Sequence, residues 1–522
     1  MCWFRADLVA AAVVALAAAT ASAAPAEAVL ATSAATPSVP PVAATSAVCC
    51  SLKDIVNELS NLSSQAEIYF PGSDQFTQYS ARWSNVGAPI VNVTVLPATE
   101  NDVVQIVSFA NKCNIPFLAF NGVHGSITTL GRMNWGIDIN LSLLSGITIA
   151  ADGQTATIAG GTNSKVVVDT LWAAGKQTVT GTCECVSYMG PALGGGHGWL
   201  QGRYGLVADQ WVSMNIVLAN GTLTTIDANS DLWWAVRGAG HNFGIVTSVT
   251  VKVYPRVYTN WAIETITFTG DKVKAVYQAV NDYLLRNGTQ PVDVTNWSYW
   301  FNDPTVDPNG PVIQLYIIQE GVTAVDPTYT QPFHALGPVS VVPDNGTYLD
   351  LAGWVGITLA SPPCQKAGLA NPRFPIYLRS YNATAQQAVY AAFAAATNAS
   401  SPFANSLFMF EGYPTEGVRA VDPDSSAYAF RTDNDLLIAP LIQYTPAGPD
   451  LDRQAEQLGN QLRNILLAGS GSAQLNTYVN YAYGDEQPQA WYGYEQWRLD
   501  RLKALKAKYD PHNRFGFYAP VV

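Results

Sequence analysis

The sequence predicts an α+β protein that is divided into more than one domain. From about residue 51 to 255, short runs rich in valine, isoleucine and threonine alternate with helical stretches and glycine turns. From about residue 256 to 460, the strands become longer, the helices become rich in alanine, and aromatic residues become frequent. These two sequence patterns, in a chain of 522 residues, indicate two large folding units.

The individual elements follow from the period of the apolar residues. Runs typical of β-strands lie at residues 88–98, 115–125, 136–142, 146–161, 243–255, 311–321 and 435–446. Runs typical of helices lie at residues 99–114, 162–176, 384–398 and 497–515. The last helix presents Leu499, Leu502 and Leu505 on one face and ends before Pro511.

Composition excludes several classes of partner. Apolar residues make up 48% of the chain and charged residues 13%, which is typical of a dense globular protein. The formal net charge of −12 is opposite to the basic surface that nucleic acids and anionic membranes require. We therefore expect a small molecule as the partner. We also expect a monomer.

The N-terminal segment predicts secretion. Residues 1–23 combine Arg5, an apolar middle and the small residues 21–23, which is the pattern of a signal peptide. A transmembrane anchor is the alternative, but the segment is short and lacks a basic flank. Residues 24–48 are rich in Ala, Pro, Ser and Thr and predict a linker or pro-segment. Glycosylation sequons, some of them expected chance matches, occur at Asn61, Asn92, Asn140, Asn220, Asn287, Asn296, Asn345, Asn382 and Asn398.

Removal of residues 1–23 would take Cys2 and leave six cysteines: Cys49, Cys50, Cys113, Cys183, Cys185 and Cys364. In an oxidising compartment all six could pair, and Cys49 or Cys50 could hold the N-terminus to Cys113. We expect no metal site, because Cys183 and Cys185 lack a second pair at zinc spacing and the chain has only five histidines.

Three glycine-rich loops would let a backbone approach a ligand closely. They lie at residues 121–126, 194–198 and 238–244. None has the spacing and strand-turn-helix context of a nicotinamide fingerprint, and each alone could be a plain turn. Their order and neighbours carry more information than any one of them.

With these neighbours, the sequence resembles the berberine bridge enzyme-like and oligosaccharide oxidase branch of the vanillyl-alcohol oxidase flavoproteins, whose FAD-binding domain is of the PCMH type. The resemblance covers residues 91–255 and returns at 478–518, in the motifs "FLAFNGVHGS", "GTCECV", "ALGGGHGWLQGRYGL", "DLWWAVRGAGHNFG", "YVNY" and "KYDPHNRF". It implies an FAD-binding domain at 49–255, a substrate domain with an antiparallel sheet covered by helices at 256–465, and a return to the first domain at 466–522.

The resemblance also implies a covalently bound FAD. By position, His124 would bond to the flavin 8α-methyl and Cys183 to flavin C6. Cys185 is an additional thiol beside Cys183, so which sulfur is bonded stays open, although spacing favours Cys183. Val123 and Ser187 stand where the family usually has glycine. The implied cofactor-binding set is Asn121, Gly122, Val123, His124, Gly125, Ser126, Gly181, Thr182, Cys183, Val186, Ser187, Gly194, Gly195, Gly196, Gly198, Gly244, Ile245, Val246 and Asn480.

Candidate catalytic residues follow from what a flavin oxidase requires. The substrate needs a base near its hydroxyl proton, and a tyrosine needs assistance because its ordinary pKa is about 10. By the resemblance, Tyr478 and Tyr481 are the candidates, with Glu411 and Arg431 as weaker ones. We expect His197 and His241 to be structural.

By the resemblance, Val186 favours oxygen access. We therefore predict a secreted FAD-dependent oxidase that takes a hydride from a carbohydrate or other alcohol and reduces O2 to H2O2. Aromatic residues suited to stacking on sugars are Trp261, Trp297, Tyr299, Trp300 and Tyr316. The alternatives are an oxidase or oxidative cyclase acting on a secondary metabolite and, from another class, a secreted binding protein that kept the fold and lost turnover.

Overall fold

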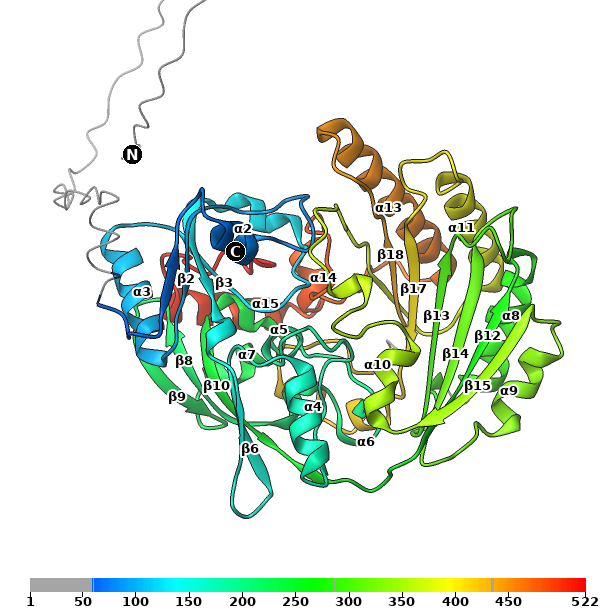
Figure 1. Cartoon of the computed structure of the whole chain (residues 1–522), viewed down its shortest axis with the longest axis horizontal. Helices are drawn as coiled ribbons and strands as arrows, with labels where there is room; N and C mark the ends of the chain where they lie inside the picture. Colours follow the sequence, from blue (N-terminus) through cyan, green and yellow to red (C-terminus); the bar gives the residue numbers. More distant parts are fainter. Residues whose placement is uncertain (1–58, 60, 286–287, 433–435) are drawn as a thin grey trace, which may run out of the picture.

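The computed structural model describes residues 59, 61–285, 288–432 and 436–522. The predicted signal peptide, the predicted linker, Cys49, Cys50 and Asn287 lie outside the described residues. Figure 1 shows two parts side by side, with the seven-stranded sheet on the right and two smaller sheets on the left. The α+β prediction is confirmed.

The first part contains a four-stranded sheet in the order β1-β2-β4-β3. Its strands are β1 (Glu67–Tyr69), β2 (Ile90–Leu96), β3 (Phe117–Phe120) and β4 (Asn134–Asn140). Strands β2 and β3 both pair with β4 in parallel, so a crossover, usually a helix, must connect β2 to β3. That helix is α3 (Glu100–Lys112), which begins at a capping box formed by Thr99 and Asp102 and buries Val103, Ile106 and Ala110.

A five-stranded antiparallel sheet completes the first part, in the order β5-β6-β10-β8-β9. Its strands are β5 (Ile147–Ile149), β6 (Thr155–Ala159), β8 (Trp211–Leu218), β9 (Leu223–Asp227) and β10 (Gly244–Lys252). The short strands β7 (Lys176–Gln177) and β11 (Tyr254–Pro255) pair separately. Helices of this part are α2 (Asp74–Ser80), α4 (Ser164–Ala173), α5 (Met189–Leu193), α6 (Gln201–Tyr204) and α7 (Leu232–Ala239).

The second part is built on a seven-stranded antiparallel sheet in the order β15-β12-β14-β13-β17-β18-β16. Its strands are β12 (Trp261–Phe268), β13 (Val294–Phe301), β14 (Val312–Glu320), β15 (Ser340–Gly346), β16 (Ile376–Leu378), β17 (Leu407–Gly412) and β18 (Leu436–Leu441). Its helices are α8 (Val273–Ala279), α9 (Pro327–His334), α10 (Leu351–Trp354), α11 (Ala383–Ala396), α12 (Glu416–Arg419) and α13 (Pro449–Ser470). No helix among the described ranges is both long and apolar enough to cross a bilayer.

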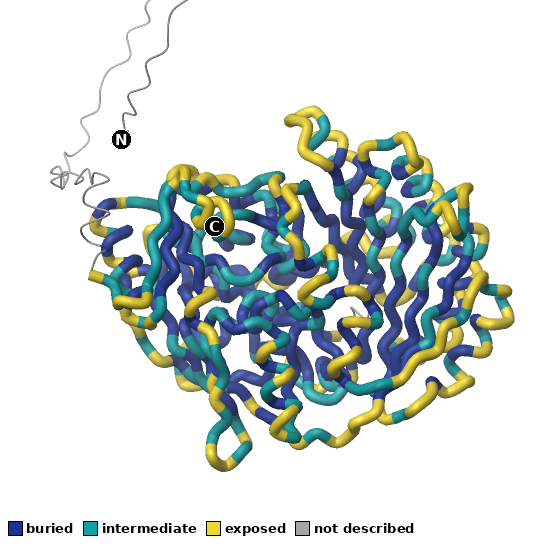
Figure 2. The backbone as a smooth tube through the Cα atoms, viewed as in Figure 1, coloured by how far each residue is buried: buried dark blue, intermediate teal, exposed yellow. Residues whose placement is uncertain are grey.

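The two faces of this sheet have different neighbours because side chains alternate along each strand. Trp300, Phe408 and Phe410 share one core with residues of α8 and α11. Trp297 belongs to the core that is continuous with the first part, and Tyr299 packs against that core. Trp300 was predicted with Trp297 as a substrate-stacking residue; that prediction is wrong, since Trp300 lies on the helix-covered face. Figure 2 shows the buried strands of both parts beneath an exposed outer layer.

The end of the chain packs on the first part. Helices α14 (Pro488–Tyr492) and α15 (Gln496–Tyr509) follow the second part, and α15 buries Leu499, Leu502 and Leu505 as predicted. The ring of Phe515 lies 5.4 Å from that of Phe117 in β3. The residues after α15 therefore complete the core of the first part.

Burial separates most of the described glycosylation sequons into buried and exposed sites, with Asn92 of β2 intermediate. The Nδ2 atoms of Asn140 and Asn296 donate buried hydrogen bonds to the carbonyl oxygens of Tyr79 and Tyr316. These two sequons are not surface sites. Asn61, Asn220, Asn345, Asn382 and Asn398 are exposed.

We expect glycopeptide mass spectrometry of protein secreted from an N-glycosylating host to find glycans at the exposed sequons and none at Asn140 or Asn296, whose acceptor nitrogens are buried. Asn220→Gln should remove the glycan mass at that peptide alone. A glycan at Asn296 would contradict the placement of β13 within the sheet.

Candidate functional site

A cavity lies in the first part, where the ends of β3 and β10 approach α5 and the C-terminal segment. It is lined by Arg82, Phe117, Leu118, Ala119, Phe120, Asn121, His124, Gly125, Leu130, Leu141, Val186, Met189, Gly190, Pro191, Leu193, His241, Gly244, Ile245, Val246, Asn480, Phe515, Phe517 and Tyr518. Most of this lining is apolar or backbone. A flat, largely apolar group with a few polar edges would suit it.

His124 follows β3 and lines this cavity. Its Nε2 atom lies 2.7 Å from the carbonyl oxygen of Pro363, and its ring lies 4.7 Å from that of Trp83. Burial, reinforced by the positive charge of Arg373, lowers the pKa of His124 to about 3. The imidazole is therefore neutral at physiological pH.

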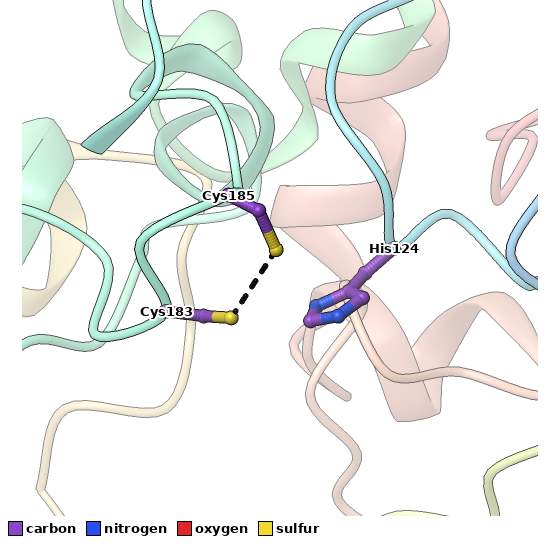
Figure 3. A group of neighbouring side chains, drawn as sticks. All are labelled: His124, Cys183 and Cys185. Carbon is purple, nitrogen blue, oxygen red and sulfur yellow. Dashed lines mark hydrogen bonds between the residues drawn. The ribbon is translucent and has the colours of Figure 1, made fainter. Parts of the chain in front are cut away.

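The three cysteines near His124 are not equivalent. Cys185 forms a disulfide with Cys364, whereas Cys183 is a buried free thiol. The Sγ atom of Cys183 lies 3.5 Å from the Sγ atoms of both Cys185 and Cys364. Figure 3 shows the ring of His124 facing the two sulfurs of the Cys183-X-Cys185 segment. The expectation that all six cysteines after residue 23 could pair is therefore wrong, because Cys183, the cysteine that spacing favours as a flavin ligand, is a free thiol.

The oxidation state of Cys185 also bears on metal binding. The donor atoms of His124, Cys183 and Cys185 lie within 4.8 Å of one another. A disulfide sulfur is not the thiolate that metals require, so this cluster does not have the donor set of a zinc site. Burial raises the pKa of the Cys183 thiol to about 11. Cys113 is disulfide-bonded, and its predicted partners lie outside the described residues.

The predicted cofactor-binding residues fall into two groups. Those that line the cavity are Asn121, His124, Gly125, Val186, Gly244, Ile245, Val246 and Asn480. Those that do not are Gly122, Val123, Ser126, Gly181, Thr182, Cys183, Ser187, Gly194, Gly195, Gly196 and Gly198. Gly181 and Thr182 line a second, smaller cavity beside Trp199 and Tyr348.

Most glycines of the second group leave no room for a side chain. A Cβ atom on Gly122 would lie 3.0 Å from the backbone nitrogen of Ser187, so Gly122 lets the two attachment segments touch. In the 194–198 run, a Cβ atom would meet Asn480, the ring of Tyr428, Val207 and the carbonyl oxygen of Thr180 in turn. These neighbours account for the glycines sterically, and their contact with a cofactor stays a prediction.

Glu411 is the buried carboxylate of the site. It lies in β17, opposite Trp297 of β13, on the face that meets the first part. Its Oε2 accepts a hydrogen bond from the Tyr413 hydroxyl at 2.8 Å, and its Oε1 accepts one from the Tyr481 hydroxyl at 2.9 Å. Burial raises the pKa of Glu411, while these two hydrogen bonds and Arg373 oppose the rise.

Tyr478 and Tyr481 occupy different networks. Burial and the nearby Glu411 carboxylate raise the pKa of Tyr481 well above its ordinary value, and its hydroxyl is bonded to that carboxylate. The Tyr478 hydroxyl instead accepts a hydrogen bond from the backbone N–H of His197 at 3.3 Å. His197 in turn contacts Gln201 and Tyr377 through its ring nitrogens. Tyr481, rather than Tyr478, is therefore joined to Glu411.

Arg431, predicted as a weaker candidate, is held by an acidic residue of the first part. Its guanidinium forms a buried two-point ion pair with Asp209, through NH1 at 2.9 Å and NH2 at 2.8 Å. This pair joins the segment after α12 to the first part. A structural role accounts for Arg431, and a role in the reaction stays a prediction.

Sequence reasoning missed Arg373, which is 4% exposed. Its guanidinium carbon lies 4.5 Å from the ring centre of Trp83 and 4.4 Å from that of Tyr481. It therefore connects the neighbour of His124 to the neighbour of Glu411. No motif surrounds it in "NPRFP", and only the isolation of a cation between two prolines could have drawn attention to it.

The residues present fit an FAD. The cavity offers apolar walls for a flat ring and a neutral imidazole, and the free thiol of Cys183 lies within 4.8 Å of that imidazole although it does not line the cavity. Within the described part of the chain, Asn480 Oδ1 and His241 Nδ1 are buried without a hydrogen-bond partner. Both residues line the cavity, so a ligand with polar edges would satisfy them.

Comparison with known proteins gives two family matches. Residues 91–227 match the family described as FAD binding domain, and residues 477–521 match the family described as berberine and berberine like. The FAD-linked oxidoreductase chyH of Penicillium rubens is 60% identical over 460 residues, which cover 88% of this chain and 92% of that protein. The FAD-linked oxidoreductase chry5 of Gibberella zeae is 55% identical over 472 residues, covering 88% and 93%.

Solved structures have the same fold at low identity. Physcomitrella patens BBE-like 1 superposes with a TM-score of 0.75 at 21% identity, covering 90% of this chain and 99% of that one. A glucooligosaccharide oxidase from Acremonium strictum, whose description names a 6-S-cysteinyl, 8α-N1-histidyl FAD, gives 0.74 at 18% identity, covering 90% and 98%.

Two half-buried histidines, His197 and His241, predict acid sensitivity. Burial lowers the pKa of His197 and of His241 to about 4 each. The unfolded chain protonates them below about pH 6.5, so between these pH values it binds more protons than the folded chain. The contribution of these residues to stability is therefore complete above pH 6.5 and is lost as the pH falls towards 4.

We expect the thermal unfolding temperature to fall between pH 7 and pH 4.5, and to fall less in His197→Gln. Calorimetry of both proteins across this range measures the difference. An equal decrease in the two proteins would show that His197 does not take up a proton on unfolding.

Proposed function

The chain belongs to the berberine bridge enzyme-like FAD-linked oxidoreductases, and on that premise we propose that it is an oxidase that removes a hydride from a CH–OH carbon of a small molecule and transfers the electrons to O2. The observation that carries the proposal is the Glu411–Tyr481 hydrogen bond on the sheet face that meets the first part. A buried carboxylate bonded to a tyrosine hydroxyl can accept a proton from an alcohol.

The substrate proton would move along the hydrogen bond that joins Tyr481 to Glu411. The substrate hydroxyl donates to the Tyr481 oxygen, and Tyr481 passes its own proton to Oε1 of Glu411, 2.9 Å away. The raised pKa of Glu411 makes its carboxylate a stronger base than a solvent-exposed one. Tyr413 holds the second carboxylate oxygen and so fixes its orientation. The bound flavin supplies the two-electron acceptor that takes the hydride.

We propose that His124 and Cys183 hold the FAD covalently, through the 8α-methyl and C6 positions respectively. The neutral imidazole, the free thiol and the disulfide at Cys185 support these two residues. The bicovalent FAD named for the glucooligosaccharide oxidase is a property of that protein and supports the same arrangement here. Val186 lines the cavity, and its role in oxygen access is part of the proposal.

The proposed substrate is an alcohol on a ring-bearing molecule, with a carbohydrate as the first candidate. The ring of Trp199 lines the smaller cavity, whereas Trp297 and Tyr316 are buried in the core, 2% and 5% exposed. A ring such as that of Trp199 stacks on sugar faces and equally on aromatic metabolites. A secondary metabolite is therefore the second candidate, and secretion of the enzyme is proposed with the first.

Covalent attachment can be measured on acid-precipitated protein. We expect a yellow, washed pellet carrying one FAD by intact mass, with His124 and Cys183 peptides modified. His124→Ala and Cys183→Ala should each retain one bond, because the other residue is unchanged. The double variant should release its flavin into the supernatant. Complete release from the unaltered protein would exclude covalent attachment.

Glu411→Gln and Tyr481→Phe should each slow flavin reduction by about 10²-fold or more, the usual contribution of general base catalysis. Stopped-flow absorbance with sugars and with aromatic alcohols as donors measures the rate, and H2O2 release identifies the acceptor. Tyr478→Phe, which leaves the Glu411 bond intact, separates the two tyrosines. Unchanged reduction in Glu411→Gln would remove Glu411 from the mechanism, and no turnover with any donor would favour a binding protein.

A further inference from the structure

One segment of the second part holds both attachment segments of the first part. Residues 357–366, between β15 and β16, contact His124 through the Pro363 carbonyl at 2.7 Å and Cys185 through the Cys364 disulfide. The carbonyl oxygen of Ile357 accepts hydrogen bonds from the Glu184 N–H at 3.2 Å and the Cys183 thiol at 3.5 Å. We call residues 357–366 the strap.

The contact with Pro363 selects one tautomer of His124. A backbone carbonyl can only accept a hydrogen bond, so the Nε2 atom that faces it must carry the proton. Because the ring is neutral, Nδ1 then holds the free lone pair. The strap thus distinguishes two ring nitrogens that an untethered imidazole would leave interchangeable.

The disulfide selects one sulfur in the same way. Cys183, Cys185 and Cys364 converge, and two of the three are consumed by their mutual bond. The attachment segment therefore presents a single thiol, although its sequence contains two. The same strap carries both restrictions, since Pro363 and Cys364 are adjacent.

We propose that the strap is a positioning element for flavin attachment, which directs the bond at His124 to Nδ1 and reserves Cys183 for the bond at sulfur. The inference rests on the proposed covalent attachment. In the His124 step, Nδ1 bonds to the 8α carbon while a methyl C–H bond and the Nε2–H bond break. The two protons and the C–H electron pair pass to the flavin, and O2 reoxidises it to give H2O2. In the Cys183 step, the sulfur bonds to flavin C6 while the S–H and C6–H bonds break. The two protons and the C–H electron pair again pass to the flavin, which O2 reoxidises.

The test removes the tether and keeps both attachment residues. In Cys185→Ser/Cys364→Ser, we expect attachment at His124 to slow roughly 10- to 100-fold, the loss typical of a misplaced reacting group. Attachment at Cys183 should persist. Peptide mass spectrometry of acid-precipitated protein gives the yield at each residue, and NMR of the isolated flavin peptide identifies the linked nitrogen. Cys113→Ser, which removes a disulfide outside the strap, is the matched control and should retain both bonds.

A milder variant covers the case in which the double serine protein fails to fold. The hydroxyl of Ser361 accepts a hydrogen bond from the Thr358 N–H at 3.1 Å and closes the turn of the strap. Thr358→Val/Ser361→Ala should loosen that turn while keeping the disulfide, and should lower the yield at His124 relative to Cys183. Unaltered yields and Nδ1 linkage in whichever strap variants fold would overturn the inference. No covalent flavin in the unaltered protein would instead overturn the proposed attachment itself.

Discussion

The site depends on one buried cation. The Arg373 guanidinium lies between the rings of Trp83 and Tyr481, and its Nε has no hydrogen-bond partner among the described residues. Burying a charge is costly unless it is compensated, and two ring faces compensate it only in part. Burial raises the pKa of Glu411 and of Cys183, and the positive charge of Arg373 opposes that rise. For His124, burial lowers the pKa and the same charge lowers it further. One positive charge thus favours the anionic form of the acids and the neutral form of the imidazole.

The alternation of side chains along β13 and β17 decides which residues can reach this cation. Trp297 and Glu411 face the first part, whereas Trp300 and Phe410 face the helices. A shift of register by one residue would exchange these sets and remove the carboxylate from the site. The register of the seven-stranded sheet therefore places the carboxylate that we propose as the base.

Much of the fold was predictable because its elements have regular periods. The strands at 88–98 and 311–321 and the helix at 497–515 were predicted from pattern alone, and the structure contains β2, β14 and α15 there. The order of the glycine loops drew attention to His124 and Cys183.

Other site residues could not be predicted because their contacts join distant, irregular segments. Pro363 reaches His124 across 239 residues, and Cys185 pairs with Cys364 across 179. No period in the sequence encodes such distances. The glycines at 194–198 are a different case: their immediate neighbours are protein side chains and backbone, and contact with a ligand stays a prediction.

The position of the C-terminus has a consequence for biosynthesis. The backbone N–H of Val521 and the carbonyl oxygen of Ala519 are both bonded to the Asn242 side chain, beside β10 of the first part. Lys506 donates further hydrogen bonds to the carbonyl oxygens of Asn242 and Phe515. The first part thus lacks some of its core until residues 506–521 have been synthesised. Its folding therefore cannot be completed from residues 59–255 alone, and the second part must be made before the cofactor pocket can close.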